Sequence, residues 1–382
     1  MMKEYKHTKA KEASLKSEDK NELGAKLSAP VILASVILLS LAYITDIIYT
    51  KNTVSAVGET FIISRFLLEA GNLLQKLIFP LISTGIAAVY GGLGAIPGGL
   101  LGGMLAGIGS TYESANANAT SVSGVFCSLL AGFIAGSCTR SALKIFRRHS
   151  QKDEVTPFIF VPAFSLIITL FAVLLLNTVS GYINYLACTL AGLAGKTNPL
   201  AVSVILGIFM TADAGGPLYL AGYTFGVASI STGNPEYMAI VIAAGAIPPL
   251  TMGLYTIAYK ERTQGYEKAL GIAGIGGGLL GLPQSALVFY TKKTYRFILA
   301  CIPGGILAGM LSLSLNCSSE LPAGGILSFT SYGRPLFFIF ALACGAMVST
   351  FLLSLTDGYN YITETQNHKE GPEAAESLSV QI

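Results

Sequence analysis

One acidic side chain stands out within the apolar part of the chain. Residues 197–235 contain a single charge, Asp213, and two apolar stretches flank it. A carboxylate within a membrane segment costs about 2.5–3.5 kcal/mol on insertion scales, so it persists where it is paired, faces a cavity or touches substrate. Asp213 is therefore the first candidate for binding a polar solute.

The residues after Asp213 predict an interrupted helix. Gly215, Gly216 and Pro217 follow it, and proline removes a backbone donor and disfavours a continuous helix. An interrupted membrane helix exposes backbone N–H and C=O groups that can bind a polar solute. We expect Asp213, Gly215 and Gly216 to line such a site. The alternative is an acid that caps a helix at a loop nearer the surface.

A second candidate lies later in the chain, in the segment GLLGLPQSALVF. Gln284 and Ser285 directly follow Pro283, so their polar side chains could meet hydroxyl groups of a substrate at a proline break. Membrane helices also use such side chains for hydrogen bonds to one another. Both interpretations stay open, and Gln284 and Ser285 complete the predicted substrate-binding set.

Other motifs favour structural roles. The glycine-rich run 91–109 contains GxxxG spacings such as Gly99 with Gly103, which favour close helix packing, and no GK[ST] follows to make a phosphate loop. The three histidines lie in charged segments, and the six cysteines show no CxxC or Cys/His spacing. We expect no catalytic residue, metal site or cofactor.

The composition points to lipid as the main solvent. Of 382 residues, 52% are hydrophobic and 12% are charged, whereas soluble domains carry about 25% charged residues. The mean hydropathy is +0.62. Together with the charge-free runs along the chain, these values predict an all-α polytopic membrane protein of about nine or ten transmembrane helices with broken or re-entrant segments. A net charge of +3 is too small to suggest a nucleic-acid partner.

The distribution of charge divides the chain into three parts. We expect a disordered, Lys-rich tail at 1–26, a membrane-embedded domain at 27–356 and a polar tail at 357–382. The first apolar run is interpreted as an uncleaved anchor. Basic residues also gather at 140–152 and 260–268. Because positive charges mark cytoplasmic segments, both termini are expected in the cytoplasm.

Two long charge-free runs carry more specific expectations. Residues 77–112 are long enough for two passes with a turn, and the glycine-rich part reads as a broken or re-entrant element. Residues 157–195 hold one long helix, with room for an interfacial one.

Five segments in series resemble the membrane subunit, component IIC, of the fructose family of the bacterial phosphoenolpyruvate-dependent sugar phosphotransferase system. ILGIFMTADAGGPLYLAGYTFG at 205–226 is similar to the family's FDMGGPxNKAAYAFG, and GAIPPLTMGL at 245–254 to its GMVPPLGMAL. The other three are FPLISTGIAAVYGGLGAIPGGLLGG at 79–103, SGVFCSLLAGFIAGSCTRSALKI at 123–145 and YRFILACIPGGILAG at 295–309. Order and spacing agree over about residues 75–310.

The resemblance also shows departures at expected site positions. Asp213 is retained, but Tyr219 and Leu220 stand where the family has Asn-Lys. PQSALVF aligns with TEGAIPF, which places Gln284 where the family has a glutamate that is expected to contact the sugar. An Asp of the family's AADP becomes Lys293. Gln can still hydrogen-bond sugar hydroxyls, but it cannot act as a base.

The resemblance implies a transport mechanism with protein partners. The membrane subunit would bind a sugar and expose it to the cytoplasm, where a IIB protein would phosphorylate it from a phosphocysteine charged by a IIA phosphohistidine. With tails of about 26 residues, IIB and IIA are expected as separate chains, and the membrane subunit is expected to be a homodimer in the bacterial inner membrane.

Three functions remain in consideration at this point. The first is a fructose-type sugar permease of the phosphotransferase system. The second is a secondary transporter driven by an ion gradient, and the third is a non-transporting sensor on the same fold. The altered positions at Gln284 and at Tyr219–Leu220 motivate the second and third.

Overall fold

The computed structural model describes most of the membrane-embedded part of the chain. The described residues are 28, 30–42, 44–45, 62–108, 110–114, 117–121, 124–149, 155–213, 215–260, 263, 266–286, 289–290, 294–320, 325 and 332–356. The expected tails, 1–26 and 357–382, lie outside them, so the predictions of disorder and of cytoplasmic termini stay predictions, as does the boundary of the membrane domain.

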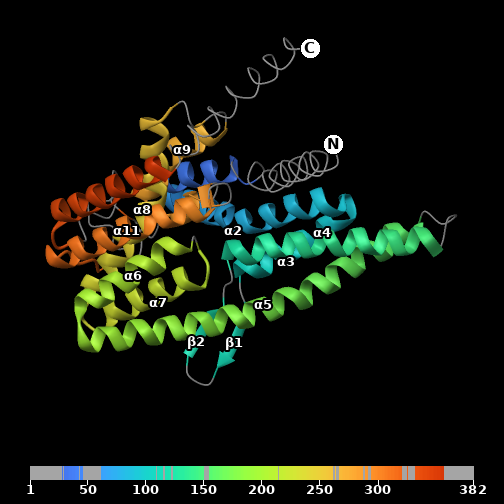
Figure 1. Ribbon diagram of the computed structural model, residues 1–382, viewed down its shortest axis with the longest axis horizontal. Coiled ribbons are helices and arrows are strands. Elements are labelled where there is room, and N and C mark those ends of the chain that lie inside the picture. The colour runs from blue at the N-terminus through green and yellow to red at the C-terminus, as the bar shows by residue number, and fades with distance from the viewer. Residues whose placement is uncertain are drawn as a thin grey trace, which may run out of the picture.

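The described part of the chain is helical apart from one small hairpin (Figure 1). Its first half contains α2 (Ile62–Gly91), the 3-10 turn η1 (Leu93–Ala95), α3 (Ile96–Ile108), β1 (Ser110–Ser114), β2 (Ala117–Ser121), α4 (Gly124–His149) and α5 (Val155–Thr197). Its second half contains α6 (Pro199–Ala212), α7 (Pro217–Ser231), α8 (Pro235–Ala258), α9 (Tyr266–Leu279), the 3-10 turn η2 (Pro283–Ala286) and α11 (Thr294–Ser314). Apolar helices at Pro30–Ala42 and Pro335–Thr356 stand before and after these elements. The all-α prediction is confirmed.

Several helices have the length and composition of membrane spans. Five described helices are long and apolar enough to cross a bilayer, and three shorter apolar helices accompany them. The polytopic membrane class is therefore confirmed, whereas the count of nine or ten spans stays a prediction. The five are Ile62–Gly91, Ile159–Gly195, Pro235–Ala258, Tyr295–Ser314 and Pro335–Thr356.

The glycine-rich run forms a helical hairpin that is packed on both sides. α2 ends at Gly91, η1 turns the chain, and α3 returns as a helix of 13 residues, about 20 Å long and shorter than the hydrocarbon core. A Cβ at Gly103 would lie 2.5 Å from the Phe79 carbonyl oxygen of α2, and one at Gly102 would lie 2.7 Å from Thr169 of α5. The packing interpretation of these glycines is confirmed.

α5 is one continuous helix of 43 residues. At 1.5 Å per residue it is about 65 Å long, roughly twice the thickness of the hydrocarbon core. It runs along one side of the molecule in Figure 1, and only 22% of its most apolar stretch is buried within the protein. The long helix expected at 157–195 is confirmed. Residues 157–195 all belong to this one helix, so they form no separate interfacial helix.

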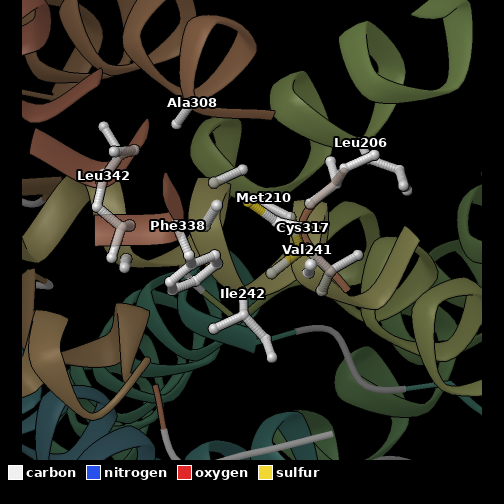
Figure 2. Packing of buried hydrophobic residues seen from close by; sticks show 14 of the residues in the cluster. Leu206, Met210, Val241, Ile242, Ala308, Cys317, Phe338 and Leu342 are labelled. Carbon is white, nitrogen blue, oxygen red and sulfur yellow. The ribbon is translucent and has the colours of Figure 1, made fainter. Parts of the chain in front are cut away.

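α8 occupies the centre of the second half. Within the protein, 89% of its most apolar stretch is buried. It packs against α6, α7, α9 and α11. Figure 2 shows Val241 and Ile242 of α8 within a cluster that includes Leu206 and Met210 of α6 and Phe338 of the last helix. This core fixes α6, whose end carries the first candidate site.

Close packing at Gly103 gives a testable expectation. We expect Gly103→Val to lower the free energy of unfolding by about 1–3 kcal/mol, because the new side chain must displace backbone of α2. Gly192→Val is the matched control, since Gly192 is also helical and a Cβ there meets nothing within 4 Å. Thermal unfolding in detergent measures both. An equal loss in the two variants would contradict the packing role of Gly103.

Candidate functional site

Asp213 ends α6 at the predicted interruption. Its backbone is extended, with φ −143° and ψ 113°, and the Gly215 N–H donates to the Asp213 carbonyl oxygen at 3.0 Å. Gly215 has φ +88°, a conformation that glycine adopts without a steric penalty. α7 begins at Pro217, where the fixed φ of proline suits the first helical turn. The prediction of a break at this sequence is confirmed.

The carboxylate of Asp213 bridges the break. Its Oδ2 accepts a hydrogen bond from the Leu218 N–H at 3.4 Å. A Cβ at Gly216 would lie 2.0 Å from Oδ2, so only glycine leaves room for the carboxylate there. The carboxylate thus caps the first turn of α7, as the alternative interpretation expected of an acid at a helix end. The half-buried carboxylate still offers further lone pairs, because an ionised carboxyl group has about four acceptor sites.

The first residue of α4 contacts the same loop. Gly124 has φ +63°, and a Cβ there would lie 2.2 Å from the Gly215 carbonyl oxygen and 2.6 Å from Cα of Gly216. The N-terminus of a helix carries a partial positive charge. α4 and α7 both begin at this loop, so two such ends lie close to the acidic residue that the loop carries.

The segment that contains the second candidate is tied to the end of α6. The Tyr290 hydroxyl donates to the Thr211 carbonyl oxygen at 2.5 Å, and the bond is buried. Thr211 lies two residues before Asp213, in the last turn of α6. Tyr290 follows η2, which carries Gln284, by four residues. One hydrogen bond thus connects the two segments in which sequence analysis placed its site residues.

The predicted residues of η2 are placed by α8 and α9, which both contact this turn. The Ser285 hydroxyl is buried, donates to the Leu282 carbonyl oxygen at 2.6 Å and packs against Gly277 of α9. Gln284 lies in η2, and its side chain is outside the described part of the structure. Asp213, Gly215 and Gly216 therefore form one loop, while substrate contacts by these three, Gln284 and Ser285 stay predictions.

Sequence reasoning missed two residues of this region. Gly124 precedes an apolar run like many other glycines, and Tyr290 looks like an ordinary aromatic residue beside a basic loop. Both contact a segment that is remote in sequence. No local pattern marks either contact, because each depends on how distant helices pack.

Comparison with known proteins identifies relatives that match between 41% and 86% of this chain. No family model matches the chain. The "PTS system fructose-specific EIIB'BC component" of Vibrio cholerae is 33% identical over 160 residues, which is 41% of this chain and 28% of that protein. The "Fructose permease IIC component" of Bacillus amyloliquefaciens is 29% identical over 255 residues, 66% of this chain and 82% of the relative. The "PTS system fructose-specific EIIC component" of Haloferax volcanii is 25% identical over 343 residues, 86% of this chain and 89% of the relative.

The chain is a homologue of fructose-family IIC membrane subunits. It covers 28% to 40% of the length of the first curated relatives, which carry EIIA or EIIB parts in their names as well as EIIC. The IIC homologues from Bacillus amyloliquefaciens and Haloferax volcanii match over most of their own length. The resemblance stated from five motifs is confirmed.

The close approach of Gly124 to the Asp213 loop can be tested. Gly124→Ala adds both backbone strain, because φ is +63°, and a clash with Gly215. Gly233→Ala is the matched control, since Gly233 has φ +81° and a Cβ there meets nothing within 4 Å. We expect Gly124→Ala to be less stable than Gly233→Ala by about 1–3 kcal/mol. Thermal unfolding of the two variants decides this, and equal stability would contradict the contact.

Proposed function

We propose that the protein is the membrane-spanning sugar permease of a fructose-type phosphotransferase system. The single observation that supports this most is the interrupted helix α6–α7, where a half-buried acid lies beside a Gly-Gly-Pro turn in a homologue of fructose-family IIC subunits. Sugars present many hydroxyl groups, each a donor and an acceptor. A carboxylate at a helix interruption is a suitable acceptor for them.

In this proposal the loop and η2 supply different contacts. Asp213 accepts hydrogen bonds from sugar hydroxyls, while Gly215 and Gly216 let the sugar approach the backbone. Gln284 both donates and accepts through its amide, and Ser285 contributes its hydroxyl, which can accept a second hydrogen bond while it donates to Leu282. None of these residues is a cysteine or a histidine, which are the phosphoryl carriers expected of IIB and IIA, so in this proposal the partner proteins phosphorylate the sugar.

The partners follow from the same proposal. The permease delivers sugar to a IIB protein, which a IIA protein recharges. Homologues whose names join EIIA or EIIB to EIIC support this arrangement. The permease lies in the inner membrane as a multi-pass protein, with both termini in the cytoplasm, and works as a homodimer.

Removal of the carboxylate tests the role of Asp213. We expect Asp213→Ala to abolish sugar uptake, and Asp213→Asn to lower it by about tenfold or more, since hydrogen bonds to a charged group contribute about 1.5–3 kcal/mol. Both variants should still reach the membrane. Uptake of labelled sugar in cells that express IIA and IIB provides the measurement.

Glu236→Gln is the matched control for these variants. Glu236 is an exposed acid in the first turn of α8, so loss of its charge should leave uptake unchanged. Normal uptake by Asp213→Ala would remove Asp213 from the site.

The chemical form of the internalised sugar tests the mechanism. We expect sugar phosphate to accumulate, and accumulation to stop when IIB is deleted. Unmodified sugar that enters with a proton or sodium gradient and without IIB would instead identify an ion-coupled transporter. A flat titration of purified protein against a panel of sugars would indicate a sensor of another kind.

A further inference from the structure

The Tyr290 hydroxyl satisfies a backbone group that a helix end leaves open. The last four carbonyl groups of a helix lack partners within the helix, and Thr211 is one residue before the end of α6. The Tyr290 hydroxyl donates to this carbonyl at 2.5 Å in a buried position. At membrane depth an unpaired backbone group costs several kcal/mol. The bond therefore stabilises the interruption itself.

The ring of Tyr290 is held independently of this bond. It packs edge-on against Phe297 of α11, with ring centroids 5.0 Å apart and planes at 82°. Phe297 also packs edge-on against Phe289, at 5.5 Å and 77°. These rings belong to a buried cluster that includes Ile82 of α2 and Met252 of α8. A phenylalanine at position 290 would keep this packing and lose only the hydroxyl.

The bond joins directly two segments that are otherwise connected through α8, against which both α6 and η2 pack. η2 is placed by α8 and α9, whereas the Asp213 loop is placed by α6, α7 and Gly124. Tyr290 follows Gln284 by six residue-to-residue steps, and two of these steps lie within the 3-10 turn η2, so the two Cα atoms are at most about 18 Å apart. The anchor at Tyr290 consequently limits how far Gln284 can move from the end of α6.

We propose that Tyr290 is a positioning residue for sugar binding, because its hydroxyl fixes the Gln284 segment and the Asp213 loop relative to each other. Tyr290 itself need not touch the sugar. The proposal rests on the proposed function in one respect, that Asp213 and Gln284 bind the same sugar. Loss of the hydroxyl should weaken sugar binding and leave the phosphorylation of bound sugar intact.

Tyr290→Phe is the test variant, and Ser64→Ala is its matched control. The Ser64 hydroxyl is also buried and donates to a distant backbone carbonyl, that of Ala42, at 2.8 Å. It joins α2 to the helix Pro30–Ala42, and neither of these helices forms the α6–α7 break. Each variant therefore removes one buried hydroxyl–carbonyl bond, and only Tyr290→Phe removes a bond to the end of α6.

Two measurements on the full-length proteins in membranes or detergent separate positioning from stability. We expect Tyr290→Phe to raise the KM for fructose uptake about three- to tenfold, as loss of one hydrogen bond predicts, with kcat within about twofold of wild type. We expect amide exchange of residues 211–218 to rise by a similar factor in Tyr290→Phe and to stay unchanged in Ser64→Ala.

Each outcome decides the proposal. Wild-type KM and wild-type exchange in Tyr290→Phe would overturn it, as would equal rises in KM in both variants that track equal losses of thermal stability. If the wild-type protein takes up no fructose, the proposed function fails. The amide exchange then still decides whether the Tyr290 hydroxyl orders the Asp213 loop.

Discussion

An interrupted helix within a membrane must pair its free backbone groups without help from bulk water. At the α6–α7 break the chain meets this constraint in two ways. Side chains pair with free backbone groups, and a proline stands where a backbone N–H would otherwise lack a partner. The Asp213 carboxylate accepts from the Leu218 N–H, Pro217 has no N–H to satisfy, and the Tyr290 hydroxyl donates to the Thr211 carbonyl. The same groups that make the break possible place a carboxylate at it. The pairing of the backbone groups and the position of the carboxylate thus depend on one arrangement.

Glycine has two separate uses in this fold. In α3 it allows neighbouring helices to approach, as at Gly103 against α2 and Gly102 against α5. At the α6–α7 break it supplies a backbone conformation at Gly215 and space beneath a carboxylate at Gly216. The first use tolerates change when a neighbour can move, since packing adjusts by small shifts. The second does not, because a side chain at Gly216 would occupy the space of the carboxylate and displace it.

Local chemistry explains what could be predicted from the sequence. The break at 213–217 was predicted because Gly-Gly-Pro encodes it within five residues, and the long charge-free runs predicted helices because length and apolarity are also local properties. The continuity of α5 was less evident, since 43 residues exceed what one span requires. The contacts of Gly124 and Tyr290 were not predictable, because each joins segments that only the packing of α4, α6 and α11 brings together.

The Asp213 loop lies where two groups of helices meet. α2, α3, α4 and α5 pack on one another, and α6, α8, α9 and α11 form a second group around α8. Gly124 brings the start of α4 against Gly215 and Gly216, while Tyr290 ties the loop to a core cluster that contains residues of both groups. A displacement of one group relative to the other would therefore act directly on the backbone that holds the carboxylate. In the proposed permease, movement of one helix group against the other would act on the sugar site through these contacts of the loop.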